Sequence, residues 1–275
     1  MPSRNTEIAH ASDLALWDAF VAQAAQDGQD AQQLAVAWAW ERASAGVCWR
    51  TIRRGLMTLA SRRDVRVPAS MTDDVRRAVS RRGKQARPIR ADQLRALLRS
   101  LGDSERDVML RALCLVLWCG ALRVSEAHDM RWSDLLWEDE GVRYLLRASK
   151  TDQYAEGAEI ALPRHPVTSL CPCAALAAWR DASQHAHDAV WCRNGKPISQ
   201  LTHLVSRFVK AQLGAGYSSH SFRAGWITEA AAAGVTEAAM MLQTRHKTTG
   251  QLVPYIRHVR LWTDNPAAQV ARRLG

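Results

Sequence analysis

The sequence predicts a mainly α-helical protein of two domains, with a small β-hairpin in the second domain. Three observations support this prediction. Apolar residues recur at helical spacing along most of the 275 residues. One strand-like stretch with a polar centre interrupts them between residues 141 and 162. A basic segment at 84–90, next to Gly83 and containing Pro88, separates two helical blocks and has the composition of a linker.

Four helices are expected in the first domain, residues 1–83. Ser12 is a candidate N-cap for the first helix and Gly28 a candidate stop. The fourth helix is expected to begin near Thr72, with acidic residues in its first turn, and to end at Gly83. The second and third helices are expected at about 30–45 and 48–63.

The second domain, residues 91–275, is expected to open with a helix at Asp92. The predicted hairpin pairs residues 141–147 with 159–162, and its polar tip contains Lys150. A short amphipathic tail helix is expected at 264–274; a helix of this length is not stable by itself, so its apolar face must dock on another surface. The remaining helices are expected at about 168–183, 199–213, 218–233 and 236–242.

The composition is that of a soluble globular protein, with 47% hydrophobic and 23% charged residues. The first twelve residues have no apolar core, so no signal peptide is expected, and the longest apolar run, 113–119, is too short to span a bilayer. The six cysteines are expected to be reduced thiols. Cys171 and Cys173 form the one close pair, and no second Cys/His pair stands at zinc-finger spacing, so no metal site is predicted.

Positive charge is concentrated in one block of the sequence. Residues 42–90 contain 14 basic and three acidic residues, a net charge of +11, whereas residues 1–41 carry −5 and residues 91–275 carry +4. Around 48–63 the arginines alternate with apolar residues, which predicts an amphipathic helix with a basic outer face. Such a face is often only solvated, but this concentration of charge favours a nucleic-acid partner. The candidate DNA contacts are Arg50, Arg53, Arg54, Lys84 and Arg87.

Several short patterns in the second domain could carry chemistry. His220 and Arg223 are three residues apart near a predicted helix start, a spacing that suits an anion but also occurs often by chance. Arg123 follows an apolar helix and precedes Glu126. Its side chain could lie at a cleft or form a local ion pair with Glu126. Lys150 at the hairpin tip could donate a proton, or be an ordinary exposed lysine.

Tyr255 lies nine residues after His246 and is followed by the basic residues Arg257 and His258, unusual company for a core tyrosine. A tyrosine hydroxyl becomes a useful nucleophile only when cations and a proton acceptor surround it. The ordered set as a whole resembles the tyrosine recombinase (phage integrase) family, over nearly the whole chain. The matching positions are Arg123, Lys150, His220, Arg223, His246 and Tyr255. Two residues depart from the usual pattern of the family. Many members have glycine at the position of Arg245, and a proline directly before the tyrosine, as at Pro254, is not a general feature of the family.

The resemblance implies a two-domain, C-shaped clamp on duplex DNA in which Tyr255 attacks a phosphodiester and forms a 3′-phosphotyrosyl bond. Arg123 and Arg223 would then hold the phosphate, and His246 would donate a further hydrogen bond. Lys150 would be the general acid, His220 would take part in proton transfer or orient the phosphate, and Glu126 would position His220 or Arg123.

The resemblance also implies a homo-tetramer on two DNA duplexes, linked by the tail helix of each subunit. No metal, nucleotide or other cofactor is expected, nor any membrane partner, and the expected location is the cytoplasm, with the nucleoid in a bacterium. Three other functions stay open: a type IB topoisomerase, a telomere resolvase, and a catalytically idle DNA-binding protein on the same scaffold.

Overall fold

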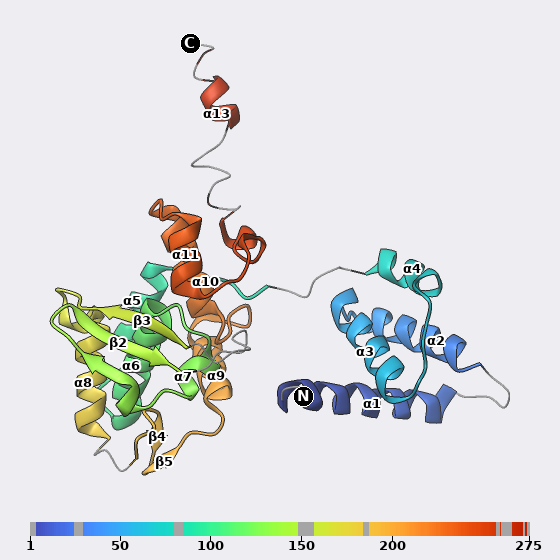
Figure 1. The fold of residues 1–275 in the computed structure, drawn as a ribbon, viewed down its shortest axis with the longest axis horizontal. Helices are drawn as coiled ribbons and strands as arrows, with labels where there is room; N and C mark the ends of the chain where they lie inside the picture. The colour runs from blue at the N-terminus through green and yellow to red at the C-terminus, as the bar shows by residue number, and fades with distance from the viewer. Residues whose placement is uncertain are drawn as a thin grey trace. The chain divides into compact units, whose positions relative to one another are not determined.

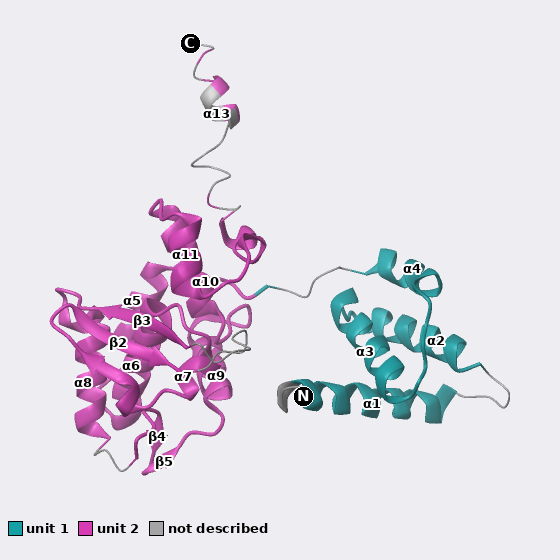
Figure 2. Ribbon diagram, viewed as in Figure 1, with its two compact units in different colours: residues 1–85 teal, residues 86–275 magenta. Residues whose placement is uncertain are grey.

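The computed structural model describes residues 4–24, 30–79, 85–147, 157–183, 187–256, 259, 266–271 and 273. The chain divides into two compact units, Met1–Gln85 and Ala86–Gly275, and each is described by itself (Figure 2). The prediction of a mainly α-helical protein with small β-structure is confirmed (Figure 1). None of the helices described is long and apolar enough to cross a membrane.

Unit 1 is a bundle of helices around two tryptophans. The rings of Trp17 and Trp38 meet edge to face with 6.0 Å between centroids, and Leu34 and Leu59 complete the core. Gly55 allows the third helix to approach Trp38, since a Cβ there would lie 2.4 Å from the indole ring. The helices are α1 (Arg4–Ala24), α2 (Ala31–Ser44), α3 (Trp49–Arg62) and α4 (Ala69–Ala78).

Two expected helix starts in unit 1 are wrong. Helix α1 begins at Arg4 and runs through Ser12, because residues 4–11 contain no glycine or proline that would prevent an earlier start. Helix α4 begins directly after Pro68, before Thr72, and ends at Ala78. The expected stops Gly28 and Gly83 lie outside the described residues.

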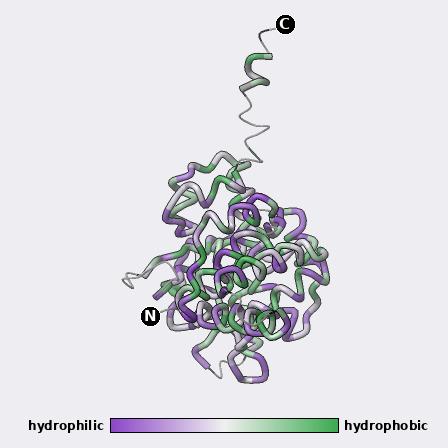
Figure 3. The backbone as a smooth tube through the Cα atoms, turned by 90° about the vertical axis from the view of Figure 1, so that its right-hand side faces the viewer, coloured by the Kyte–Doolittle hydropathy of each residue, from purple (hydrophilic) through white to green (hydrophobic). Residues whose placement is uncertain are grey.

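Unit 2 is built around a central helix, α6 (Glu105–Cys119). Ser104 caps it by accepting a hydrogen bond from the N–H of Asp107 at 3.2 Å. Most of its residues after Val108 are fully buried, because α5 (Ala91–Arg99), α8 (Pro172–Ala182), α10 (Ser221–Ala232) and the sheet all pack around it. In Figure 3, hydrophobic and hydrophilic colours alternate along the tube, as expected for helices that bury only one side.

The predicted hairpin exists and belongs to an antiparallel sheet of order β1–β2–β3. Strand β2 (Gly141–Leu146) pairs with β3 (Ala158–Pro163), Tyr144 opposite Ile160, and both of these side chains are buried. The sequence did not reveal β1 (Leu135–Trp137), because three residues are too few to show an alternating pattern. The two-residue strands β4 (Cys192–Arg193) and β5 (Lys196–Pro197) were missed for the same reason.

The remaining elements carry the candidate site. Helix α7 (Val124–His128) follows α6, α9 (Leu201–Leu213) precedes α10, and α11 (Glu237–Thr244) follows it. Residues 253–256 are helical and contain Tyr255. Of the expected tail helix at 264–274, the structure describes α13 (Pro266–Ala271).

Residues 86–90, expected in the linker, are instead part of unit 2. Ile89 is fully buried, its N–H donates to the carbonyl of Ser221 at 2.9 Å, and its carbonyl accepts from the indole of Trp118 at 3.1 Å. Arg87 likewise donates its N–H to the carbonyl of Gly216 at 3.0 Å. A single apolar residue makes no sequence pattern, and its partners lie far along the chain, so the docking was not predictable.

Candidate active site

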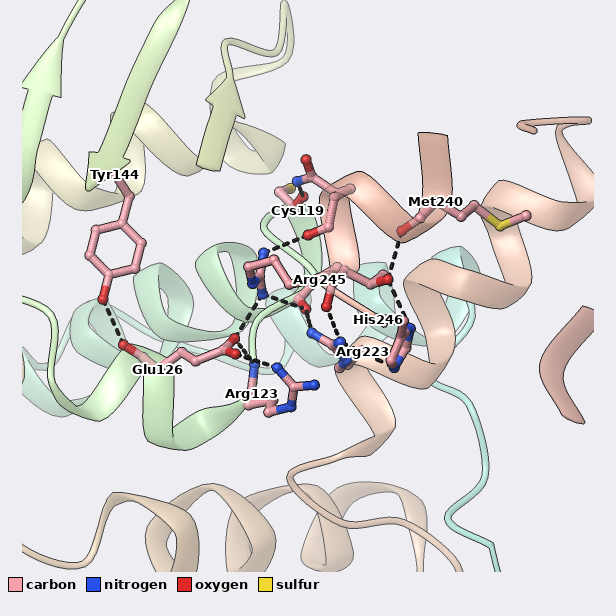
Figure 4. Close-up of polar contacts among 11 residues, drawn as sticks. Cys119, Arg123, Glu126, Tyr144, Arg223, Met240, Arg245 and His246 are labelled. Carbon is pink, nitrogen blue, oxygen red and sulfur yellow. Dashed lines mark hydrogen bonds and ion pairs between the residues drawn. The ribbon is translucent and has the colours of Figure 1, made fainter. Parts of the chain in front are cut away.

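The turn between α6 and α7 positions Arg123. Ala121 adopts a left-handed conformation (φ 46°), and Arg123 becomes the N-cap of α7. The carboxylate of Glu126 accepts from the backbone N–H of Arg123 at 2.8 Å and from its Nη1 at 2.5 Å (Figure 4). Tyr144 on β2 donates its hydroxyl to the carbonyl of Glu126 at 2.8 Å, which fixes α7 against the sheet.

Arg223 on α10 is fully buried. Its Nη1 donates to the carbonyl of Ala121 at 2.6 Å, and its Nη2 donates to the carbonyl of Thr244. Among the described residues its Nε has no hydrogen-bond partner. Burial, followed by the positive charge of Arg123, lowers the pKa of Arg223 to about 9. A buried guanidinium with a donor to spare, close to a second guanidinium, suits an anionic ligand.

His246 follows α11 and lies against Arg223. Its Nδ1 is 2.8 Å from the hydroxyl of Thr244, and its Nε2 is 3.2 Å from Nη2 of Arg223. Thr244 already donates its hydroxyl hydrogen to the carbonyl of Met240 at 2.6 Å, so Nδ1 must carry the proton in this arrangement. Burial, with the charges of Arg223 and Arg123, lowers the pKa of His246 to about 4. His246 is therefore neutral, and its Nε2 is an acceptor in this state.

The side chains of Tyr255 and His220 contact each other. The phenol oxygen lies 3.1 Å from Nε2 of His220, the N-cap residue of α10. His220 is exposed to solvent, but partial desolvation of the imidazole, followed by the charges of Arg223 and Arg123, lowers its pKa. A neutral imidazole at hydrogen-bond distance can accept the phenol proton.

Arg245 completes the charged cluster, and the sequence marked it only as a departure from the family pattern. It adopts a left-handed conformation (φ 55°, ψ 41°) at the end of α11, which costs a non-glycine residue about 1 kcal/mol. Its Nη2 donates to Glu126 at 2.7 Å. Burial would raise the pKa of Glu126, but the charges of Arg245 and Arg123 and the Arg123 N–H outweigh it, so this pKa is lowered.

Comparisons with known proteins identify the family of the chain. The family model described as "Phage integrase family" matches residues 87–260, more than half of the chain. This chain belongs to the phage integrase family. The predicted resemblance is thereby confirmed, and the match spans the region that contains all six predicted catalytic positions.

The chain is similar to the integrase/recombinase XerD homolog of Selenomonas ruminantium, with 32% identity over 186 residues. That alignment covers 62% of this chain and 53% of the relative, so the chain spans about half the length of the curated relative it matches.

Two solved structures share the fold. The Tn1549 transposon integrase in complex with transposon right-end DNA superposes with a TM-score of 0.68 and 17% identity, covering 100% of this chain and 95% of that one. The XerH recombinase bound to palindromic difH substrate superposes with a TM-score of 0.67 and 13% identity, covering 94% of this chain and 78% of that one.

The structure brings together five of the residues that the sequence singled out as the integrase catalytic set. They are Arg123, His220, Arg223, His246 and Tyr255. Lys150 lies outside the described residues. Of the two partners expected for Glu126, the carboxylate contacts Arg123, and its second cation is Arg245 rather than a histidine.

The candidate DNA contacts differ in their surroundings. Arg50 and Arg53 are exposed on α3. Arg54 is held by Asp13, a buried residue of α1, in a two-bond ion pair of 2.7 and 3.0 Å. Arg87 is exposed beside Gly216, and Lys84 lies outside the described residues. Arg50, Arg53 and Arg54 line a surface hollow that also includes His10, Trp49, Met57 and Ser61.

In the part of the chain that the structure describes, no group of three or more His, Cys, Asp or Glu side chains could hold a metal ion. Cys171 and Cys173 are both buried at the start of α8, where the Cys173 thiol contacts the carbonyl of Leu162 at 3.3 Å.

Proposed function

We propose that this protein is a site-specific DNA recombinase that cuts and rejoins duplex DNA through a 3′-phosphotyrosyl bond at Tyr255. One observation carries the proposal: the phenol of Tyr255 lies 3.1 Å from the His220 imidazole, whose pKa is lowered in part by Arg223 and Arg123. A proton acceptor at the tyrosine oxygen, with two guanidinium groups near that acceptor, provides what a phosphoryl-transfer nucleophile needs.

In the cleavage step the Tyr255 oxygen attacks the phosphorus in line while Nε2 of His220 accepts the phenol proton. The new bond joins the tyrosine oxygen to phosphorus, and the bond that breaks joins phosphorus to the 5′-oxygen. A protonated imidazole could not accept this proton, so the low pKa of His220 supports its role as the base.

Arg123 and Arg223 stabilise the negative charge that grows on the non-bridging phosphate oxygens. Arg223 is positioned by the carbonyls of Ala121 and Thr244, and Arg123 by Glu126, so neither must be ordered when DNA binds. Loss of one such pre-positioned donor costs about 3–4 kcal/mol in the transition state. His246 donates to the phosphate in either of two other states. It can gain a second proton, on Nε2, or its ring hydrogen can move from Nδ1 to Nε2 by exchange with solvent while the Thr244 hydroxyl turns to donate to Nδ1.

Lys150 completes the set as general acid, giving a proton to the departing 5′-oxygen. Rejoining is the reverse reaction, in which a 5′-hydroxyl attacks the phosphotyrosyl bond. Because this bond preserves the energy of the phosphodiester, the proposed cycle requires no nucleotide cofactor. The guanidinium groups of Arg123 and Arg223 and the ammonium group of Lys150 take the place that metal ions have in many nucleases.

Unit 1 supplies duplex binding in this proposal, chiefly through the exposed Arg50 and Arg53 of α3 in the major groove. The printed descriptions of the structural relatives, which name DNA complexes, support duplex DNA as the partner. The site would then work in the cytoplasm, within a tetramer on two duplexes.

The test uses a nicked suicide duplex, from which the fragment after the cut diffuses away and traps the covalent adduct. The chain should form a covalent DNA adduct in EDTA, and Tyr255→Phe should form none while binding DNA nearly as well. Tyr217→Phe is the matched control. Tyr217 is buried and its hydroxyl accepts a hydrogen bond from Gln93, so its substitution should leave adduct formation intact. An adduct with the Tyr255 variant, or none with the wild type, would refute the assignment.

Two further measurements separate the remaining alternatives. Reciprocal strand exchange between two sites distinguishes a recombinase from a type IB topoisomerase, which relaxes supercoils without exchange. Truncation after residue 260 should spare binding to one site and weaken synapsis, because the tail helix has an apolar face to dock. Full recombination by the truncated chain would show that the tail does not link subunits.

A further inference from the structure

Arg245 is the residue of this site whose presence the proposed chemistry does not explain. Its backbone is left-handed, a conformation for which glycine is the least strained residue. Its side chain turns inward, toward α7, and is only 11% exposed.

The two terminal nitrogens of Arg245 are both used within the protein. Nη1 donates to the carbonyl of Gln243 at 2.5 Å, and Nη2 donates to Oε2 of Glu126 at 2.7 Å. The bond to Gln243 holds the Arg245 side chain on α11, and the bond to Glu126 joins the end of α11, which leads to His246, to the turn of α7 that presents Arg123 (Figure 4). The remaining nitrogen, Nε, is buried, so Arg245 presents no accessible guanidinium donor to a phosphate.

Glu126 divides its carboxylate between two cations. Oε1 bonds Nη1 of Arg123 at 2.5 Å, while Oε2 bonds Arg245 and the backbone N–H of Arg123. The Glu126 side chain is 3% exposed, so without Arg245 a buried carboxylate would keep a single cation partner. The Arg123 side chain is more exposed, at 22%, and of its guanidinium nitrogens only Nη1 is engaged by a side chain of the described residues.

Building on the recombinase function proposed above, we propose that Arg245 is a positioning residue for strand cleavage. It holds the Glu126 carboxylate so that Arg123 presents its free guanidinium nitrogens to the scissile phosphate, and it does not itself bind the phosphate. A glycine before His246 has no side chain, so it could not hold the Glu126 carboxylate as Arg245 does in this protein.

The charges around Glu126 make the arrangement sensitive to pH. The groups that face it are Arg123 beside it, Arg245 after α11, Arg223 on α10 and Tyr144 on β2. Of the influences that lower the pKa of Glu126, the charge of Arg245 is the largest. Loss of Arg245 should therefore let Glu126 protonate at higher pH, where it releases Arg123.

The experiment measures single-turnover cleavage of the suicide duplex by Arg245→Gly, Glu126→Gln and the double variant, with DNA affinity and thermal stability recorded for each. We expect Arg245→Gly to slow cleavage roughly 10- to 100-fold, the range typical of residues that orient a reactive group, with little change in DNA affinity. The fall of the cleavage rate on the acid side of the pH profile should begin at a higher pH in Arg245→Gly than in the wild type. The double variant should be no slower than the slower single variant, and Glu126→Gln should abolish the pH shift.

Three results would overturn the proposal. Defects that multiply in the double variant would mean that Arg245 acts independently of Glu126, as a phosphate ligand does. Unchanged cleavage by Arg245→Gly would remove any role. A defect that disappears at lower temperature, together with a lower melting temperature, would mean a purely structural role. Arg245→Lys keeps the positive charge at this position. It should cleave faster than Arg245→Gly, and its cleavage rate should fall at a pH closer to that of the wild type. A wild-type chain without any adduct refutes the recombinase function instead.

Discussion

Gly225 is the position where a single added methyl group should separate the 86–90 segment from α10. An ideal Cβ at this residue would lie 1.9 Å from the carbonyl oxygen of Ile89 and 2.7 Å from its carbonyl carbon. Both atoms are backbone, so no side-chain rotation can relieve the overlap. In Gly225→Ala the segment must retreat by about 1 Å, which its hydrogen bonds to Ser221 and Trp118 do not allow.

The expected cost follows from what the segment loses. Exposure of the Ile89 side chain costs about 1.5–3 kcal/mol. The bonds of Ile89 with Ser221 and Trp118, and of Arg87 with Gly216, contribute about 1 kcal/mol each. Alanine regains about 1 kcal/mol of helix propensity over glycine. Undocking should therefore cost about 3–5 kcal/mol, which in a unit of this size lowers the melting temperature by roughly 10 °C.

Hydrogen exchange followed by mass spectrometry provides the local assay, alongside thermal unfolding. The peptide that contains the Ile89 amide should lose protection in Gly225→Ala, and cleavage should fall because α10 also carries Arg223. Gly102→Ala is the control, since the nearest atom to its Cβ is a side-chain oxygen of Asp107 at 3.5 Å. A Gly225→Ala protein with an unchanged melting temperature and a protected Ile89 amide would refute this reasoning.

Three further predictions concern binding, chemistry and pH. Arg53→Ala should weaken DNA binding and reduce its salt dependence by about one phosphate contact, whereas Arg54→Ala should mainly destabilise unit 1 by about 1–3 kcal/mol, because it leaves the buried Asp13 without its cation; equal effects of both on affinity and stability would contradict this difference. Lys150→Ala should slow cleavage strongly and be largely rescued by a 5′-bridging phosphorothiolate, since a thiolate leaves without a proton; equal defects on the oxygen and sulfur substrates would contradict a general acid. His246 has a pKa of about 4 in the fold against 6.5 as its ordinary value, so the unfolded chain binds the extra proton first and stability should fall as pH drops from about 6.5 to about 4, by at most about 3 kcal/mol; thermal unfolding of His246→Gln should show a shallower decline, and identical pH profiles would exclude this contribution.

The sequence by itself was sufficient to identify the family, to select the candidate site residues and to predict the main elements of the fold. The order and residue types of six positions were sufficient to identify the family, because each chemical role accepts few side chains; they are Arg123, Lys150, His220, Arg223, His246 and Tyr255. The hairpin and most of the helices were also predictable, since alternation and helical periodicity are local properties of the chain.

Only the tertiary structure decided how these groups are held and charged. Arg245 meets Glu126 across 119 positions of sequence, and Arg54 meets Asp13 across 41, so neither ion pair leaves a local pattern. The proton position on His246 depends on the Thr244 hydroxyl, whose hydrogen is already given to Met240. From the sequence alone, Ile89 was predicted to belong to a basic linker; its hydrogen bonds to residues of α6 and α10 are visible only in the structure. Pairing, burial and protonation depend on neighbours distant in sequence, and the fold alone brings those neighbours together.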